Sequence, residues 1–243
     1  MSSEPRMVEV RQNVLKQNDL LARALRERFR AAGVLVVSMV STPGAGKTAL
    51  LEQTLTRLRN SGLRVAALVG DLATENDARR LARSEAPVRQ IVTGTICHLD
   101  AQMVERALVD WSLDELDILF IENVGNLVCP SSYDLGEQLR LVLMSVTEGE
   151  DKPLKYPTIF NTADVAVITK MDLADAVEFD LRAARENIQA VRPGMKILEL
   201  STKTGKGSCE FLELLNSHRE QGIATNPANV DGQLSTYVET ATP

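Results

Sequence analysis

The sequence predicts an α/β fold: a mostly parallel, twisted sheet of about seven strands with helices on both faces. Two observations carry this prediction. Apolar runs rich in β-branched residues alternate with stretches of helical periodicity along most of the chain. The first such run, 34–40, leads into a glycine-containing loop at 41–48, which a helix follows. This order is typical of a phosphate-binding loop, so the expected class is the P-loop NTPase fold.

The individual elements follow from local patterns. Residues 9–30 have apolar side chains near helical spacing, and Gly33 is expected to end that helix. The residues at 139–146 favour a strand, with a helix as the alternative. The other strands are predicted at 34–40, 64–69, 90–92, 116–121, 164–169 and 196–200, and the other helices at 47–59, 76–84, 99–110, 179–191 and 208–221.

Composition narrows the class of protein. The chain has 243 residues, of which 44% are hydrophobic, enough for one domain with a full core. A net charge of -6 and 4% aromatic residues argue against a nucleic-acid partner. Neither a membrane span nor a signal peptide is recognisable, and three cysteines suit free thiols, so we expect a cytoplasmic protein without a membrane partner. The basic helix near the N-terminus is either a solvated face or a docking surface for an acidic partner.

The loop at 41–48 reads Ser-Thr-Pro-Gly-Ala-Gly-Lys-Thr. Its glycines allow successive backbone N–H groups to surround phosphate oxygens at the positive end of a helix. Lys47 is expected to bridge the terminal phosphates, and the Thr48 hydroxyl to bind Mg²⁺. The general motif begins with Gly where this chain has Ser41. The residues expected to contact nucleotide here are Pro43, Gly44, Ala45, Gly46, Lys47, Thr48 and Ala49.

Two acids follow predicted strands at the edge where parallel sheets bind ligands. Glu122 ends an apolar strand and is expected to bind Mg²⁺ directly or through water. Asp71 ends the second strand and is the other candidate, although turns also favour Asp. Together with Lys47 and Thr48 these acids form the predicted catalytic set. Gly125 lies three residues after Glu122, where a GTPase would sense the γ-phosphate.

A second motif, Thr169-Lys170-Met171-Asp172, predicts guanine recognition. The Asp172 carboxylate can accept from both N1–H and the 2-amino group of guanine, a pair that adenine lacks. The Lys170 stem can lie along the base, and Ser201, Thr202 and Lys203 are placed to reach the guanine oxygen. GTPases usually have Asn at the first position. This chain has Thr169 there. Because that position mainly braces the phosphate loop, guanine selection should survive the change, and we expect GTP rather than ATP.

Cys97, His98 and Cys129 are candidate metal ligands between these two motifs. Thiolate and imidazole suit tetrahedral Zn²⁺ or square-planar Ni²⁺. Three ligands are one short of a closed zinc site, and a symmetric dimer would double the set. The alternative is that both cysteines are small core residues. Cys209 and His218 on the last predicted helix are interpreted as structural.

Taken together, the motifs resemble the HypB family of hydrogenase nickel-incorporation GTPases, of the SIMIBI class, over roughly residues 8–220. The matching segments are Asn18-Asp19, the phosphate loop, Gly70-Asp71, Glu75-Asn76-Asp77-Ala78, 94–101, 122–130 and 151–157. The resemblance implies a slow GTPase that dimerises with GTP and carries nickel or zinc at Cys97, His98 and Cys129. It also implies delivery of nickel to a hydrogenase large-subunit precursor, with a small zinc-containing accessory partner.

The chain also departs from some family members. It lacks an N-terminal Cys-rich or His-rich stretch, which argues against nickel storage, and Gln102 stands where some members have a further His. The urease nickel-insertion type is a weaker match, because its Cys-Pro-His motif is absent. Two further alternatives are a nucleotide-locked metal-binding module and a regulatory GTPase that recruits a separate nickel donor.

These expectations combine into a domain plan and a mechanism. The plan is an N-terminal helical extension at 1–32, a P-loop GTPase domain with an inserted metal site at 33–221, and a disordered tail at 222–243. In the hypothesised mechanism, GTP and Mg²⁺ engage the catalytic set, and the segment 122–129 shifts and closes the dimer around the metal ligands. Hydrolysis then reverses the change.

Overall fold

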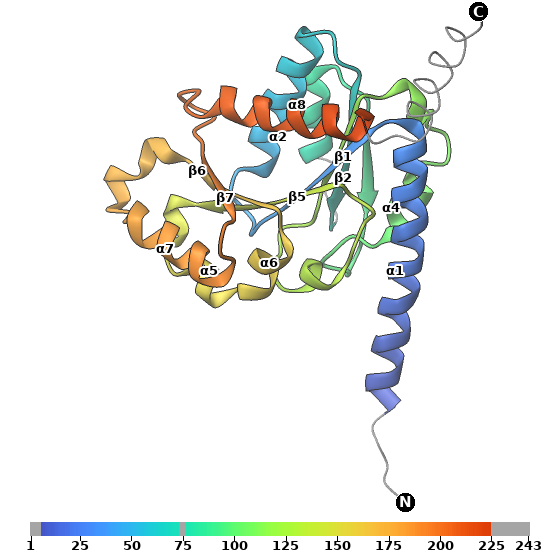
Figure 1. Ribbon diagram of the computed structural model, residues 1–243, viewed down its shortest axis with the longest axis horizontal. Coiled ribbons are helices and arrows are strands. Elements are labelled where there is room, and N and C mark those ends of the chain that lie inside the picture. Colours follow the sequence, from blue (N-terminus) through green and yellow to red (C-terminus); the bar gives the residue numbers. More distant parts are fainter. Residues whose placement is uncertain (1–5, 73–75, 225–243) are drawn as a thin grey trace, which may run out of the picture.

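The structure is a computed structural model that describes residues 6–72 and 76–224. In this part of the chain, the centre is a seven-stranded, all-parallel sheet with the order β3-β2-β4-β1-β5-β6-β7 (Figure 1). This confirms the predicted fold class and shows 139–146 to be largely strand. The strands are β1 Leu35–Val40, β2 Val65–Asp71, β3 Val88–Val92, β4 Ile118–Glu122, β5 Leu139–Ser145, β6 Val165–Thr169 and β7 Lys196–Glu199.

Helices cover both faces of the sheet (Figure 1). Helices α2 and α8 pack on one face, and α1, α4, α6 and α7 pack on the other. The bounds are α1 Arg6–Ala32, α2 Lys47–Asn60, α3 Asn76–Leu81, α4 Ala101–Ala107, α5 Lys152–Lys155, α6 Pro157–Thr162, α7 Leu181–Val191 and α8 Ser208–Ala224. Short 3₁₀ turns occupy Ala82–Ser84, Leu113–Glu115, Cys129–Ser132, Val146–Glu148, Met171–Leu173 and Asp175–Val177.

The continuous apolar runs arise because the central strands are buried on both faces. In β1, Val37 and Met39 belong to the core under α2 and α8, whereas Val36 belongs to the core under α1 and α4. Successive strand side chains point to opposite faces, so both neighbours in the sequence must be apolar. This burial fixes the strands and brings their carboxyl ends to one common edge.

Several predicted boundaries need correction. The helix expected at 99–110 is shorter at both ends. It begins at Ala101, because the Asp100 side chain caps α4 by accepting a hydrogen bond from the Met103 N–H at 2.8 Å, and it ends at Ala107. Cys97 and His98 therefore lie in a loop. Helix α8 continues to Ala224, so the first three residues of the predicted tail are helical; 225–243 lie outside the described residues, as does Glu75. Helices α5 and α6 were not predicted.

Helix α1 extends further than expected at both ends. Its C-terminal half packs through Ala22, Leu25 and Phe29, while its N-terminal half points away from the sheet (Figure 1). Gly33, with φ 70°, ends the helix as predicted. No helix within the described ranges is both long and apolar enough to cross a membrane. The division into extension, GTPase domain and tail stays a prediction.

Candidate nucleotide and metal site

The phosphate loop joins the end of β1 to the start of α2. Gly44 and Gly46 have φ of 76° and 99°, which side chains rarely allow. The Lys47 ammonium is buried and donates to Ser41 Oγ at 2.8 Å. Burial lowers the pKa of Lys47, an effect opposed by the charges of Glu122 and Asp77. Ser41, the departure from the general motif, thus contributes an acceptor inside the loop.

Glu122 lies directly beside the first turn of α2. The Thr48 hydroxyl donates to its Oε1 at 2.7 Å, and its Oε2 is buried without a hydrogen-bond partner. Burial raises the pKa of Glu122 to about 7, against the opposing charge of Lys47. A hydroxyl and a carboxylate oxygen still lacking a partner suit a hard divalent cation such as Mg²⁺. The two predicted magnesium ligands are therefore brought together.

Asp71 shares this edge but is not placed as closely. Val69 pairs with Glu122 across β2 and β4, so Asp71 lies two residues further along the neighbouring strand. Its Oδ1 accepts from the Leu72 N–H at 2.6 Å. Asp77, at the start of α3, acts electrostatically on both Lys47 and Glu122 and was not predicted as a site residue. An acid in the first turn of the helix after β2 was the signal available.

The two segments predicted to recognise guanine meet at the carboxyl ends of β6 and β7. Ser201 Oγ donates to Asp172 Oδ1 at 2.6 Å, and the Met171 N–H donates to the Leu200 carbonyl. The Ser201 hydrogen bond lowers the pKa of Asp172, and the nearby charges of Lys203 and Lys170 act in the same direction. The Thr202 carbonyl accepts from Gln53 of α2 at 3.4 Å. Asp172 is thus held as an ionised acceptor.

Thr169 provides the expected brace of the phosphate loop. Its hydroxyl lies 2.6 Å from the Ala45 carbonyl and 3.3 Å from the Met144 carbonyl. A second, unpredicted support lies at Thr42. The buried Lys152 ammonium donates to Glu148 Oε1 at 2.6 Å and to Thr42 Oγ1 at 3.1 Å, and Thr42 also contacts Glu148. The motif at 151–157 therefore sits against the phosphate loop.

Cys97, His98 and Cys129 form one cluster. One potential ligand atom from each lies within 4.8 Å of the others, and the two Sγ atoms are 3.0 Å apart. The His98 ring packs on Tyr133, an unpredicted neighbour, with centroids 4.0 Å apart, and His98 Nδ1 is buried without a partner. Burial lowers the pKa of His98, which favours the neutral, metal-binding imidazole. This donor set fits zinc or nickel.

The hydrogen bond between the two cysteines affects the protonation of Cys97. The hydrogen bond with Cys129 and burial both raise the pKa of the Cys97 thiol. A metal that binds the Cys97 thiolate would therefore have to displace the thiol proton, and its affinity should rise with pH.

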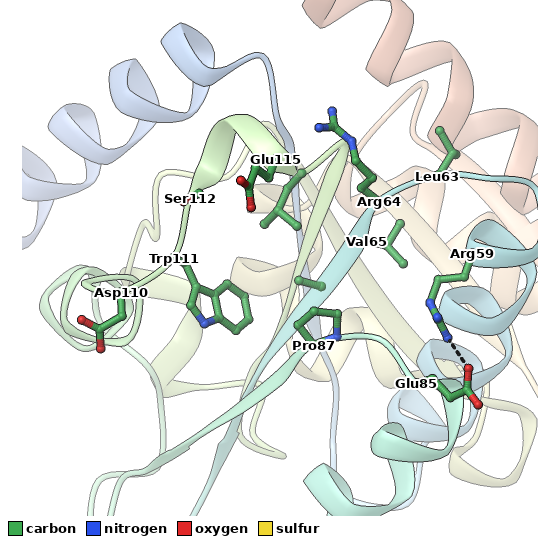
Figure 2. Close-up of a pocket in the computed structure, with 12 residues that line it drawn as sticks. Arg59, Leu63, Arg64, Val65, Glu85, Pro87, Asp110, Trp111, Ser112 and Glu115 are labelled. Carbon is green, nitrogen blue, oxygen red and sulfur yellow. Dashed lines mark hydrogen bonds and ion pairs between the residues drawn. The ribbon is translucent and has the colours of Figure 1, made fainter.

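A cavity of about 530 Å³ lies at the opposite edge of the sheet (Figure 2). Trp111, Pro87 and Leu63 are among its lining residues. Its two arginines are already paired: Arg64 with Asp117 at 2.9 Å, and Arg59 with Glu85 at 3.1 Å. No predicted site residue lines this cavity, so it is separate from the nucleotide and metal site.

Fold and site together define a P-loop nucleotide-binding protein with a thiol–imidazole cluster beside the nucleotide edge. Residues 35–199 match the family model "CobW/HypB/UreG, nucleotide-binding domain". The hydrogenase maturation factor HypB of Escherichia coli K12 is 46% identical over 217 residues, which cover 89% of this chain and 74% of that protein. The chain therefore belongs to the CobW/HypB/UreG family, within its HypB group of hydrogenase maturation factors.

Solved structures agree with this placement. HypB from Helicobacter pylori, in complex with nickel, has a TM-score of 0.80 and 40% identity, covering 85% of this chain and 97% of that one. HypB from Archaeoglobus fulgidus has a TM-score of 0.78 and 40% identity, covering 84% and 99%. A LAO/AO transport system kinase, 19% identical with a TM-score of 0.57, shares the fold alone. The resemblance inferred from the motifs is confirmed.

Proposed function

We propose that this protein is a GTP-hydrolysing metallochaperone that binds nickel or zinc and assists nickel insertion into a hydrogenase large-subunit precursor. One observation carries the proposal. The segment 122–129 begins at the carboxylate that contacts Thr48 and ends at a thiol of the metal-ligand cluster. The two sites are therefore joined by eight consecutive residues. Nickel in the related Helicobacter pylori structure supports the cargo.

In the nucleotide half, Lys47 would bridge the terminal phosphates and Asp172 would hold the guanine base. Thr48 and Glu122, with Asp71 nearby, would hold Mg²⁺, which when bound neutralises charge on the phosphates. Ionised Asp172 rejects adenine because that base offers no matching pair of donors. Hydrolysis would be slow, since we assign no water-positioning glutamine or arginine finger.

In the metal half, Cys97, His98 and Cys129 would take the cargo ion. The side chains of Ile96 and Val128, next to these ligands, are 41% and 62% exposed. These exposed apolar residues lie beside three ligands, one short of a closed tetrahedral site. Both features support a GTP-dependent homodimer, which would double the number of ligands. The further partners would be a small zinc-containing accessory protein and the hydrogenase precursor.

The alternative is an interaction switch that hydrolyses GTP but recruits a separate nickel donor. Nickel affinity should therefore be measured in apo, GDP-bound and non-hydrolysable-GTP protein, with oligomeric mass determined in the same samples. A nucleotide-dependent affinity coupled to dimerisation supports the metallochaperone. Equal affinity in all three states contradicts it and favours the switch. Multiple-turnover phosphate release distinguishes either GTPase from a nucleotide-locked module.

A further inference from the structure

The backbone at Gly125 lies directly against the phosphate loop. A Cβ built on Gly125 would be 2.8 Å from Pro43 Cγ and 2.9 Å from Pro43 N, so only glycine fits without displacement. Three residues earlier, Glu122 accepts the Thr48 hydroxyl. A shift of the phosphate loop at Pro43 toward this segment must therefore displace Gly125 as well.

The next residue, Asn126, connects this segment to both cysteines. Its Nδ2 donates to the Cys97 carbonyl at 3.2 Å, and its Oδ1 accepts from the Val128 N–H at 2.9 Å. Cys129 follows Val128 directly. One amide side chain therefore ties the loop that carries Cys97 to the segment that carries Cys129.

Asn123 makes similar contacts in a different environment. Its Oδ1 accepts from the Leu99 N–H at 3.0 Å and the Val124 N–H at 2.9 Å, and both Asn123 and Leu99 are buried in the core. Asn126 and Cys97 are only half-buried. The two amides thus differ in burial: Asn123 is enclosed by the core, whereas Asn126 is partly exposed and less constrained by packing.

We propose that Asn126 is a positioning residue that transmits the nucleotide state from the phosphate loop to the Cys97–Cys129 pair. The inference rests on the proposed function and specifies its coupling element. A push on Gly125 moves Asn126, and its two hydrogen bonds move the Cys97 carbonyl and the Val128 amide together. The position of the two thiols in the metal-ligand cluster then changes with the nucleotide.

The test uses full-length protein and the variants Asn126→Ala and Asn126→Asp. Gln189→Ala is the matched control, because the Gln189 amide also donates to a backbone carbonyl, that of Met195, and accepts from a backbone N–H, that of Gly194, in the turn before β7. Ni²⁺ alone is titrated with GDP-bound and non-hydrolysable-GTP protein, and the thiolate-to-nickel absorption band is recorded in each state. A coupled wild type should show an affinity ratio of roughly 5 to 150 between the states.

We expect the ratio to fall to within about twofold of one in both Asn126 variants. Their GTP affinity in the absence of nickel should not change, and the absorption band should no longer respond to nucleotide. Gln189→Ala should keep the wild-type ratio. If Asn126→Ala does not fold, Asn126→Asp decides, because its carboxylate retains the acceptor for the Val128 N–H but not the donor to Cys97.

The outcomes separate the two levels of the proposal. A wild-type ratio of one contradicts the gating in the proposed function and this inference with it. A wild-type ratio above fivefold that persists in the Asn126 variants overturns only the role of Asn126. Loss of nickel binding in every nucleotide state of these variants also overturns it, since Asn126 would then merely build the site.

Discussion

Polar side chains at the carboxyl ends of the strands differ in their hydrogen bonding from those at the amino ends. At the carboxyl edge, Glu122 Oε2 and His98 Nδ1 are buried without hydrogen-bond partners. At the amino edge, the arginines of the cavity in Figure 2 are already paired with Glu85 and Asp117. Arg219 Nε lacks a hydrogen bond, but its charge acts on Asp117. The difference is that the unpartnered atoms at the carboxyl edge belong to predicted site residues, whereas no predicted site residue lines the cavity at the amino edge.

The strongest test of this contrast is Lys47→Ala. Removing a buried charge that is proposed to bridge the phosphates should weaken GTP binding by about 30-fold or more. The fold should persist, because Lys47 contributes one side-chain hydrogen bond at the start of α2. Calorimetric GTP titration measures the first effect and circular dichroism the second. Unchanged GTP affinity would remove the nucleotide site from this edge.

Cys129→Ala tests the metal half of the same edge. Loss of one of three ligands should weaken zinc or nickel binding by more than the roughly 10- to 100-fold typical of changes behind a ligand. Cys209→Ala is the control, since Cys209 is exposed on α8. Competition with a chromophoric chelator gives both affinities. Equal losses in the two variants would place the metal elsewhere.

Glu122 provides a pH test. The pKa of Glu122 is raised from 4.5 to about 7 in the native state. Between these two pH values, the native state therefore keeps a proton that the unfolded state has lost. The resulting stabilisation is complete below pH 4.5 and disappears as pH rises through about 7. It amounts to at most about 3 kcal/mol. Relative to wild type, the unfolding free energy of Glu122→Gln should therefore rise between pH 4.5 and pH 8.

Urea denaturation without nucleotide or metal measures this difference at each pH. A difference that stays constant over the whole range would show that Glu122 ionises as readily in the native protein as in the unfolded chain.

The smallest effect on ligands is expected at the amino edge. Trp111 lines the cavity there and lies under the Arg89 guanidinium, 5.3 Å from the ring centroid. Trp111→Ala should reduce stability by about 1–3 kcal/mol and leave GTP and nickel affinities unchanged. Thermal unfolding and the same two titrations are sufficient. A clear loss of either affinity would show that the two edges communicate.

The carboxyl ends of the strands could be predicted from the sequence, because each buried apolar run is followed by polar residues. In a parallel sheet these ends share one edge. Sequence reasoning placed Glu122 and Thr48 together, and it assigned the bracing role of Thr169 correctly. It did not assign a role in the site to Asp77, Lys152 or Tyr133. These side chains are distant in sequence from the residues they act on, so only the folded structure brings them to the site. The spacing of apolar residues also placed the start of helix α4 too early, because Asp100 was not recognised as its N-terminal cap.

The Thr169 hydroxyl carries a single hydrogen and faces two carbonyls, those of Ala45 and Met144. It can donate fully to only one of them at a time. When the Ala45 carbonyl withdraws, rotation about one side-chain bond transfers the donation to Met144, and the number of hydrogen bonds is conserved. The phosphate loop can therefore move away from Thr169 while the Thr169 hydroxyl keeps one hydrogen bond, whereas the two donors of an asparagine amide would hold the loop to one position.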